Sequence, residues 1–522
     1  MASSRTRFLE GNERVTEIAK ALGMGIPESI IEPMQITDPN LYSAEAVRTM
    51  DRMAVEVQGI SSLELMQRAG KAAYAQLRQH FPNARKIAVV CGAGNNAGDG
   101  YVVARLALED NCQVDLFALA PPSQLTGDAA DCARNFLNHP QANLHSGVAL
   151  PDECDVIVDA LLGIGLSREL VGDYRLAVDR INQHSAPCLS LDVPSGVNSD
   201  SGQVHGVACK ASLTVCFIAW KAGLFLAEGR DLGGNLELEK LGVDESVVQA
   251  LRPMLGLLCA SRPFDLCPRK ADCHKGRFGH VVLIGGNYTM PGAIRLAAEA
   301  CLNAGAGVVS VITRPEHAVQ LASCVPELMC QGVTDAEQAS DLLQRASVIA
   351  IGPGLGQDEW AEALFLEVSA LSKPVIADAD ALGILSRTQG LRPDWVLTPH
   401  PGEAGKLLDR STEHVQRDRV KASADLYRAY GATIVLKGRG TLIAGSEPTC
   451  LALGGTPAMA APGMGDVLCG LIAGLIAQGL NGPQAAMLGV QVHNRAADLA
   501  AGGRTRGMRA SDVIKEIPAC AN

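Results

Sequence analysis

The stretch KIAVVCGAGNNAGDG (86–100) decides how the first half of the chain folds. It joins a continuous apolar run to a glycine-rich polar loop, and a helical pattern follows the loop. Four further apolar runs, with helical stretches between them, come after it at 112–120, 154–163, 187–196 and 213–221. Continuous apolar strands that alternate with helices are typical of a parallel sheet that is covered on both faces. The first half is therefore predicted to be a three-layer α/β domain.

A second series of apolar runs begins at HVVLIGG (280–286) and predicts a second domain of the same class. The series ends in a glycine-rich loop and a long apolar helix near 463–479. Its other runs are 308–313, 347–356, 374–382, 395–403 and 433–440. Because the chain has 522 residues and one hydrophobic core rarely exceeds ~300, two fused domains are expected.

The predicted domain boundaries follow from changes in composition. Residues 1–40 are polar with scattered prolines, so we expect a flexible N-terminal extension. The first domain is expected over 41–255 and the second over 274–522. The segment 256–273 between them is predicted to be a linker, because prolines and charges gather in it.

Composition excludes several classes of function. Lys and Arg number 45 and Asp and Glu number 56, so the net charge is −11, which argues against binding of nucleic acids or anionic membranes. Aromatic residues make up only 4% of the chain, too few for stacking platforms for single-stranded nucleic acids. No secretory signal or membrane-spanning stretch is recognisable, and the 16 cysteines form no CxxC pair. These features predict a cytoplasmic protein with reduced thiols.

The loop GAGNNAGDG (92–100) resembles a dinucleotide-binding fingerprint but does not fit one chemically. Its first two glycines and Ala97 match G-x-G-x-x-A. However, the next apolar run ends without the acidic residue that would hold a ribose, and Asp99 would repel a pyrophosphate at the start of the next helix. Asn95 and Asn96, together with Asp99, instead offer oxygens for hydroxyl groups or a hard cation.

Two further strand ends of the first domain carry polar residues. Asp159 ends the run at 154–163, and Asp192 and Ser195 lie in DVPSG at the end of the next run. The carboxyl ends of parallel strands meet at one edge of the sheet, where ligands bind. Asn96, Asp159 and Ser195 could therefore supply oxygens to one monovalent cation, and Asp192 is the candidate for proton transfer. Alternatively, DVPSG is only a turn in which Asp192 bonds its own backbone.

In the second domain, GMGD (463–466) places Asp466 just before a long apolar helix. The helix N-terminus, which two glycines leave open to close approach, suits a phosphoryl group, and Asp466 beside it can accept a proton from an attacking hydroxyl. Lys437 ends another run and could meet a nucleotide phosphate, although no GxxxxGK[ST] is present. Alternatively, Asp466 only caps the helix. His400 lies in the proline-flanked loop TPHPGE and is expected to belong to a site.

These motifs resemble those of the bifunctional NAD(P)H-hydrate repair enzymes, which join an NAD(P)HX epimerase to an ADP/ATP-dependent NAD(P)HX dehydratase. The resemblance covers about residues 40–518. In the first half it rests on MDRMAVEVQGI, LMQRAG, GAGNNAGDGYVVARL, DALLGIGL and LDVPSGVNSDSG. In the second half it rests on HKGRFGHVVLIGG, AGAGVVSV, IGPGLG, DADAL, LTPHPGEAGKLL, VLKGRGT and GMGDVLCG. It implies a Rossmann-like first domain and a ribokinase-like second domain, each an α/β/α sandwich.

The resemblance also implies roles for individual residues. Substrate contacts in the first domain would be Asn95, Asn96, Ala97, Gly98, Asp99, Gly163, Ile164, Gly165, Leu166, Ser167, Arg168, Glu169 and Asp192. A potassium ion would bind Asn96, Asp159 and Ser195. Substrate contacts in the second domain would be Ala293, Gly354, His400 and Asp466. ADP or ATP, with magnesium, would contact Lys437, Gly438, Arg439, Gly440, Thr441 and Gly465. The catalytic residues would be Asp192 and Asp466.

The implied function is the repair of NADH and NADPH that have been hydrated at C6 of the nicotinamide ring. The epimerase would interconvert the R and S hydrates, and the dehydratase would convert the S form to NADH or NADPH at the expense of ADP or ATP. The implied partners are these small molecules, without nucleic acid or membrane, and a homo-oligomer is expected. Two alternatives stay open: a ribokinase-like small-molecule kinase with a non-catalytic first domain, and a non-catalytic binding protein.

Three motifs depart from the usual pattern of the family. Ala97 stands where NNGGDG has a glycine, and Ile164 stands where G-T-G has a threonine. In GTPAMAAPGMGD, an amide and two glycines are replaced by Thr456, Ala458 and Pro462. Proline has no N–H, so an anion hole that used the N–H of residue 462 would be weakened. The GMGD segment itself is intact, and activity is still expected.

Overall fold

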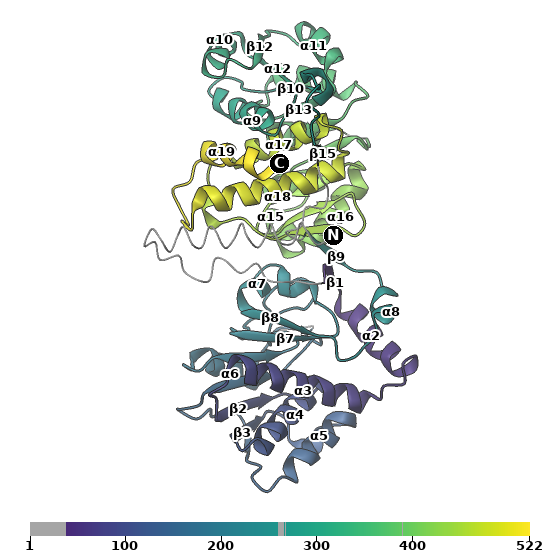
Figure 1. The fold of residues 1–522 in the computed structure, drawn as a ribbon, viewed down its shortest axis with the longest axis vertical. Coiled ribbons are helices and arrows are strands. Elements are labelled where there is room, and N and C mark those ends of the chain that lie inside the picture. The colour runs from purple at the N-terminus through teal and green to yellow at the C-terminus, as the bar shows by residue number, and fades with distance from the viewer. Residues whose placement is uncertain (1–37, 167, 259–265, 267, 389, 522) are drawn as a thin grey trace.

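The computed structural model describes residues 38–166, 168–258, 266, 268–388 and 390–521. Two α/β domains follow one another along the long axis of the molecule (Figure 1). One domain is built on a seven-stranded sheet and the other on an eleven-stranded sheet, which confirms the prediction of two α/β domains. The predicted N-terminal extension lies almost entirely outside the described residues.

The N-terminal sheet has the order β4-β3-β2-β5-β6-β7-β8, and all neighbouring strands are parallel. Its strands are β2 (Lys86–Cys91), β3 (Gln113–Ala118), β4 (Leu144–Ser146), β5 (Val156–Ala160), β6 (Cys188–Leu191), β7 (Leu213–Phe217) and β8 (Asn235–Glu239). The chain winds to one side of β2 and then to the other, starting from β5. In open α/β sheets, ligands bind at the carboxyl ends of the strands where this reversal occurs.

Helices cover both faces of the N-terminal sheet, as continuous apolar strands require. Ile87 and Val89 of β2 pack with one layer of helices, and Ala88 and Val90 pack against the opposite layer. The first layer consists of α2 (Ala44–Glu56), α3 (Ser62–His80), α4 (Asn95–Glu109), α5 (Gly127–Leu137) and α8 (Glu245–Gln249). The opposite layer contains α6 (Gly172–Gln183). A short helix, α7 (Gly229–Leu232), precedes β8 and faces the other domain (Figure 1).

The C-terminal sheet has the order β1-β9-β18-β17-β16-β15-β14-β13-β10-β11-β12. Its parallel part consists of β10 (His280–Ile284), β11 (Val308–Thr313), β12 (Met329–Gly332), β13 (Val348–Ile351), β14 (Val375–Ala377), β15 (Trp395–Leu397) and β16 (Thr433–Leu436). The antiparallel strands β17 (Thr441–Ala444) and β18 (Cys450–Ala452) follow. The strand order reverses between β10 and β13, so this sheet also has a crevice at its carboxyl edge.

Helices also cover both faces of the C-terminal sheet. Val281 and Leu283 of β10 pack with one layer, and Val282 and Ile284 pack with the other. The first layer consists of α9 (Pro291–Asn303), α10 (Pro315–Cys324), α17 (Met464–Ala477), α18 (Gly482–Ala501) and α19 (Ala510–Ala521). The second consists of α11 (Ser340–Arg345), α12 (Glu359–Ser369), α13 (Asp380–Leu385), α14 (Pro401–Leu408), α15 (Thr412–Arg417) and α16 (Arg419–Tyr430). The long apolar helix predicted near 463–479 is confirmed as α17.

Two short strands from outside the C-terminal half complete its sheet. β9 (Leu255–Leu258) pairs in parallel with β18, and β1 (Asn40–Leu41) pairs antiparallel with β9. The segment 256–273, predicted as a linker, therefore begins inside a strand. Its prolines and charges hid this, because a short apolar run becomes a strand only through a partner far along the sequence. One hydrophobic cluster runs from Trp220 and Phe225 through Leu257 into the C-terminal core, so the two domains share packed interior.

Candidate active sites

A cavity of about 690 Å³ opens at the carboxyl edge of the N-terminal sheet, beside the reversal between β2 and β5. Residues from α2, α3 and the start of α4 line it together with the loops that follow β5, β6 and β7. Among the residues predicted as substrate contacts, those that line the cavity are Asn95, Asn96, Asp99, Gly163, Ile164, Gly165 and Asp192. The structure therefore brings together three segments that are far apart in the sequence.

The other predicted contacts of this domain do not line the cavity. Ala97 is fully buried in the core, and a Cβ added to Gly98 would collide with the sulfur of Met66 on α3. The close packing of α4 against α3 therefore explains by itself why a residue without a side chain stands at position 98. The cavity lining likewise excludes Leu166, Arg168 and Glu169. Ser167 lies outside the described residues.

Asp192 is held in a fixed position by groups from the end of β7. Its backbone has a φ of 66°, and its amide donates to the Val215 carbonyl at 2.8 Å. Its carboxylate accepts from the Phe217 amide at 3.3 Å and forms an ion pair with the buried ammonium of Lys221. In the alternative interpretation, the Asp192 side chain would bond only to the backbone of its own turn. The structure differs, because the carboxylate is held by Phe217 at the end of β7 and by Lys221, which follows it.

Two further carboxylic acids share the cavity with Asp192 and Lys221. Burial raises the pKa of Asp51 to about 6, with the negative charge of Asp192 adding to the shift and Lys221 opposing it. Burial, and then the charges of Asp192 and Asp51, raise the pKa of Asp99 well above its usual range. The site thus combines carboxyl groups of different acidity, which is the condition for acid and base chemistry in one place.

Sequence reasoning missed Asp51 and Lys221. Lys221 ends the apolar run at 213–221, so the strand-end rule that selected the other residues applied to it as well. Asp51 lies on α2 within MDRMAVEVQGI, and nothing in a helical pattern indicates that this helix folds over the strand ends.

Asp159 and Ser195 are in direct contact beneath the cavity. The Ser195 hydroxyl donates to Asp159 Oδ1 at 2.6 Å, and the Ser195 amide donates to Oδ2 at 2.9 Å. The Ser190 hydroxyl and the Leu161 amide also donate to this carboxylate, at 2.8 and 3.3 Å. Asn96 lies at the cavity wall, where its amide nitrogen is buried and has no hydrogen-bond partner among the described residues.

In the C-terminal domain, Asp466 lies in the first turn of α17, and the N-cap of this helix is Gly463 with a φ of 88°. Asp466 is therefore not the N-cap residue that the alternative interpretation supposed. Burial raises its pKa to about 7, the charges of Asp378 and Asp380 add to the shift, and Lys437 opposes it. A carboxylate with this pKa at a helix N-terminus is suited to accept a proton near neutral pH.

Lys437 and Gly465, two of the predicted nucleotide contacts, lie next to each other at this site. Lys437 Nζ donates to Asp378 Oδ1 at 2.6 Å and lies 3.9 Å from Glu403 Oε2. A Cβ added to Gly465 would lie 3.2 Å from Lys437 Nζ. Sequence reasoning did not select Asp378, although it ends the apolar run in DADAL, or Glu403 of TPHPGE.

His400 is the N-cap of α14. Its Nδ1 accepts from the amides of Gly402 and Glu403 at 2.9 and 3.3 Å, which requires a neutral ring nitrogen there. The side chain is 57% exposed, and Nε2 lies 3.4 Å from Glu403 Oε1. His400 thus presents one edge of its ring to solvent at the strand ends.

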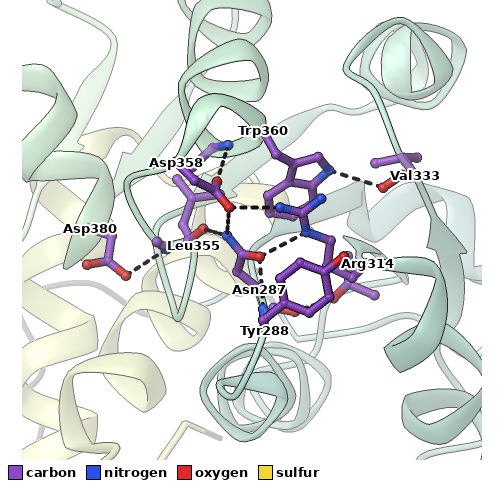
Figure 2. A network of polar contacts seen from close by, with 12 residues as sticks. Asn287, Tyr288, Arg314, Val333, Leu355, Asp358, Trp360 and Asp380 are labelled. Carbon is purple, nitrogen blue, oxygen red and sulfur yellow. Dashed lines mark hydrogen bonds and ion pairs between the residues drawn. The ribbon is translucent and has the colours of Figure 1, made fainter.

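Ala293 and Gly354 are neighbours at the reversal between β10 and β13. A Cβ added to Gly354 would lie 3.2 Å from the Ala293 Cβ, and Gly354 has a φ of 61°. Figure 2 shows the network of polar contacts that holds the loop after β13, in which Gly354 lies. Asn287 donates to the Leu355 carbonyl at 2.9 Å, and Arg314 donates to Asn287 at 2.9 Å. Gly354 thus lies on a turn that this network holds in place, and Ala293 lies beside it in the first turn of α9.

The remaining predicted nucleotide contacts form the turn between β16 and β17. Arg419 donates to the carbonyls of Leu436 and Arg439 at 3.1 and 2.7 Å. The turn contains Gly438 and Gly440, and Thr441 is the first residue of β17. The Arg439 side chain forms an ion pair with Asp231 on α7 of the N-terminal domain. The turn is therefore tied to both domains.

Comparisons with known proteins match both halves of the chain. A family model of NAD(P)H-hydrate dehydratases matches residues 281–519, and a model of the YjeF-related protein N-terminus matches residues 62–223. The chain is 45% identical over 492 residues to the bifunctional NAD(P)H-hydrate repair enzyme of Coxiella burnetii, with 92% of this chain and 99% of that protein covered. The enzyme of the same name from Escherichia coli is 39% identical over 485 residues, with 92% and 94% covered.

A solved structure matches about half of the chain. The ADP/ATP-dependent NAD(P)H-hydrate dehydratase of Bacillus subtilis, co-crystallised with ATP and Mg²⁺, is 27% identical, with a TM-score of 0.44, and covers 48% of this chain and 92% of that chain. No helix within the described ranges is both long and apolar enough to span a bilayer. Because the full-length relatives are matched across both domains, this chain belongs to the family of bifunctional NAD(P)H-hydrate repair enzymes.

Proposed function

We propose that this chain repairs hydrated NADH and NADPH in two steps, one in each domain. The N-terminal cavity interconverts the R and S hydrates, and the C-terminal site converts the S form to NADH or NADPH at the expense of ADP or ATP. Membership of the repair-enzyme family supports both steps. The observation that carries the proposal is Asp466, a carboxylate with a pKa of about 7 at a glycine-flanked helix N-terminus beside Lys437.

In the dehydratase site, Asp466 accepts the proton of the C6 hydroxyl while that oxygen attacks the terminal phosphorus of the nucleotide. The bond between this phosphorus and its bridging oxygen breaks, and AMP leaves from ADP, or ADP from ATP, with the electron pair. The backbone N–H groups in the first turn of α17 and the ammonium of Lys437 stabilise the negative charge on the transferred phosphoryl group. The C6–O bond then breaks, phosphate leaves with the electron pair, and the lone pair of the ring nitrogen compensates. Loss of a proton from C5 restores the dihydronicotinamide ring.

The nucleotide contacts proposed for this step are Lys437 to Thr441 and Gly465. Lys437 and Gly465 support this assignment because they lie together beside Asp466. The substrate contacts proposed are Ala293, Gly354, His400 and Asp466, with Ala293 and Gly354 adjacent at the strand reversal. Magnesium enters with the nucleotide, as is usual where phosphoryl groups are transferred.

In the epimerase cavity, Asp192 exchanges a proton with the C6 hydroxyl group as the C6–O bond breaks and forms again. The ion pair with Lys221 holds the Asp192 carboxylate in place. The substrate contacts proposed are the loops at Asn95 to Asp99 and Gly163 to Glu169, whose cavity-lining members support the assignment. Asp51, with a pKa raised to about 6, lines the same cavity and supplies a proton there.

A potassium ion held by Asn96, Asp159 and Ser195 is part of this proposal. These residues offer amide, carboxylate and hydroxyl oxygens, which are the donors that hard cations prefer. Asp159 and Ser195 already touch, and the amide nitrogen of Asn96 makes no hydrogen bond to any described group, so this amide can turn its oxygen toward an ion. The ion supplies a positive charge that orders the substrate loop.

We further propose a cytoplasmic homo-oligomer that binds neither nucleic acid nor membrane, in line with the net charge of −11.

The test of the function is to incubate a mixture of R and S hydrates with the protein, with and without ADP or ATP. Recovery of NADH from both epimers with nucleotide, and interconversion of the epimers without it, supports the proposal. A stable phosphorylated product would indicate a small-molecule kinase instead, and no reaction would indicate a binding protein.

A further inference from the structure

We propose that Asp378 is a positioning residue of the C-terminal site, which holds Lys437 beside Gly465 and places a second negative charge next to Asp466. This role rests on the proposed function of Asp466 as the base that accepts the C6 hydroxyl proton. Asp378 would act through Lys437 and Asp466 rather than by contact with the reacting atoms.

The geometry around Asp378 is that of a buried ion pair beneath the helix N-terminus. Asp378 directly follows β14 and is 1% exposed. Its Oδ1 accepts from Lys437 Nζ at 2.6 Å. A Cβ added to Gly465 would lie 3.4 Å from Asp378 Oδ2 and 3.2 Å from Lys437 Nζ. The pair therefore lies against the residue that immediately precedes Asp466.

Two unfavourable features at this position argue against a purely structural ion pair. Asp378 Oδ2 is buried and has no hydrogen-bond partner in the described part of the chain, although leaving a buried charged oxygen unsatisfied is costly. The next residue, Ala379, has a φ of 49° and a ψ of −120°, a backbone conformation that is strained for a residue with a Cβ. Features of this kind persist where function requires them.

The charges around Asp466 explain what the second carboxylate does. The titratable groups that face Asp466, or the ion pair next to it, are Asp378, Asp380, Glu403, Lys437, Cys469 and His493. Asp378 and Asp380 raise the pKa of Asp466, and Lys437 lowers it. Burial lowers the pKa of His493 to about 4 and raises that of Cys469, so both stay neutral near neutral pH. Asp378 therefore makes Asp466 a stronger base.

The test is the pH profile of dehydratase kcat/KM for the S hydrate with saturating nucleotide. Asp378→Asn keeps the shape of the side chain and removes its charge. Its acidic limb should move to lower pH by about one unit, because a neighbouring charge typically shifts a pKa by 1–3 units. The KM for ADP should rise as well, since Lys437 loses its anchor. Asp378→Glu restores the charge, so its limb should stay at the wild-type position even if kcat falls.

Lys437→Met supplies a second test with the opposite sign. It leaves the Asp378 charge unpaired beside Asp466, so the acidic limb should move to higher pH. The matched control is Asp394→Asn, which removes an exposed carboxylate that precedes β15 at the opposite edge of the sheet and should leave the limb in place. If Asp378→Asn does not fold, the double variant Asp378→Asn/Lys437→Met takes its place: its acidic limb should lie at lower pH than that of Lys437→Met, and the same position in both would overturn the role of Asp378.

The outcomes separate this inference from the function on which it rests. Asp466→Asn is measured in the same assay. If Asp466→Asn keeps wild-type turnover, the proposed base is wrong. If Asp466→Asn is inactive and Asp378→Asn is folded with an unmoved acidic limb and an unchanged KM for ADP, only the positioning role of Asp378 is overturned.

Discussion

Lys221 Nζ and the Asp192 carboxylate form an ion pair at the carboxyl edge of the N-terminal sheet, with side chains only 1% and 12% exposed. Lys221 also donates to the Phe217 carbonyl at 2.6 Å, and the Phe217 amide donates to Asp192 at 3.3 Å. The end of β7 thus fixes both partners. Because neither charge has much access to water, each depends on the other for its stability.

Lys221→Met should therefore destabilise the protein as well as slow epimerisation. Removing one partner of a buried ion pair leaves an uncompensated charge and typically costs about 3–5 kcal/mol. Urea unfolding at neutral pH measures this change in the free energy of unfolding. The double variant Lys221→Met/Asp192→Asn should recover much of the stability but none of the epimerase activity. Lys210→Met, at an exposed position, is the control, and an equal loss in both lysine variants would contradict the explanation.

The ionisation of Asp51 should lower the free energy of unfolding as the pH rises. Its pKa in the folded protein is about 6 against a usual value of 3.8, so the folded state holds this proton more tightly than the unfolded chain does. The resulting stabilisation is fully present below pH ~4 and is lost as pH rises through ~6. Asp51→Asn removes this loss, so the variant should unfold at higher urea concentration than the wild type at pH 8.

The comparison of the two proteins at pH 4 is the control for Asp51, because this side chain is then uncharged in the folded protein. The advantage of Asp51→Asn should shrink toward zero there. An advantage that is the same at pH 4 and pH 8 would mean that packing, and not the carboxyl proton, accounts for it.

The sequence was sufficient to predict the two α/β domains and the sheet edge at which each candidate site lies. Strand ends are readable because a continuous apolar run stops at a polar residue, as at Asp159 and Lys437. Residues on helices that fold back over those ends were not found, and Asp51 is the example. The same limit hid β9, whose pairing with β18 joins residues that lie about 190 positions apart.

The structure also distinguishes a glycine that lies at the cavity from a glycine that allows two helices to pack closely. Gly163 lies beside two polar groups of the N-terminal cavity, since a Cβ there would be 3.4 Å from both Asn96 Oδ1 and Asp192 Oδ2. Gly98 belongs to the same predicted set, yet it serves the contact between α4 and α3. Spacing along the chain cannot distinguish these cases, because both glycines lie in loops or first turns that follow apolar runs.

Dehydratase activity should depend on a group with a pKa of about 7. Asp466 must be ionised to accept a proton, so kcat/KM should fall as pH decreases below ~7. Asp466→Asn should lower kcat by about 10²–10⁴-fold while ADP still binds, as measured by calorimetry. Asp394→Asn is the control. A wild-type profile without an acidic limb between pH 5 and 8 would exclude Asp466 as the base.

Removal of potassium should lower epimerase activity more than dehydratase activity. We expect replacement of potassium by choline to slow interconversion of the hydrates, and Ser195→Ala to raise the potassium concentration needed for half-maximal rate. Ser190→Ala is the matched control, because Ser190 donates to the same Asp159 carboxylate at 2.8 Å but is not a proposed ligand. Equal potassium dependence in the two serine variants would assign the effect to the hydrogen bonds of Asp159.

The contact between α17 and α9 should be intolerant of added volume at Gly470. A Cβ on Gly470 would overlap the backbone carbonyl of Ala297, whereas a Cβ on Gly292 at the start of α9 meets no atom of the described structure within 4 Å. Gly470→Ala should lower the free energy of unfolding by about 2 kcal/mol or more. Gly292→Ala should change it by less than ~1 kcal/mol and can increase it.

Gly470→Ala should also impair catalysis in one domain only. α17 carries Asp466 and α9 carries Ala293, so forcing the helices apart separates the two sides of the dehydratase site. Dehydration of the S hydrate should slow, while interconversion of the epimers, which depends on the other sheet, should continue at the wild-type rate. Unchanged stability in Gly470→Ala would show that the two helices move apart without cost, and loss of both activities would show that the domains unfold together.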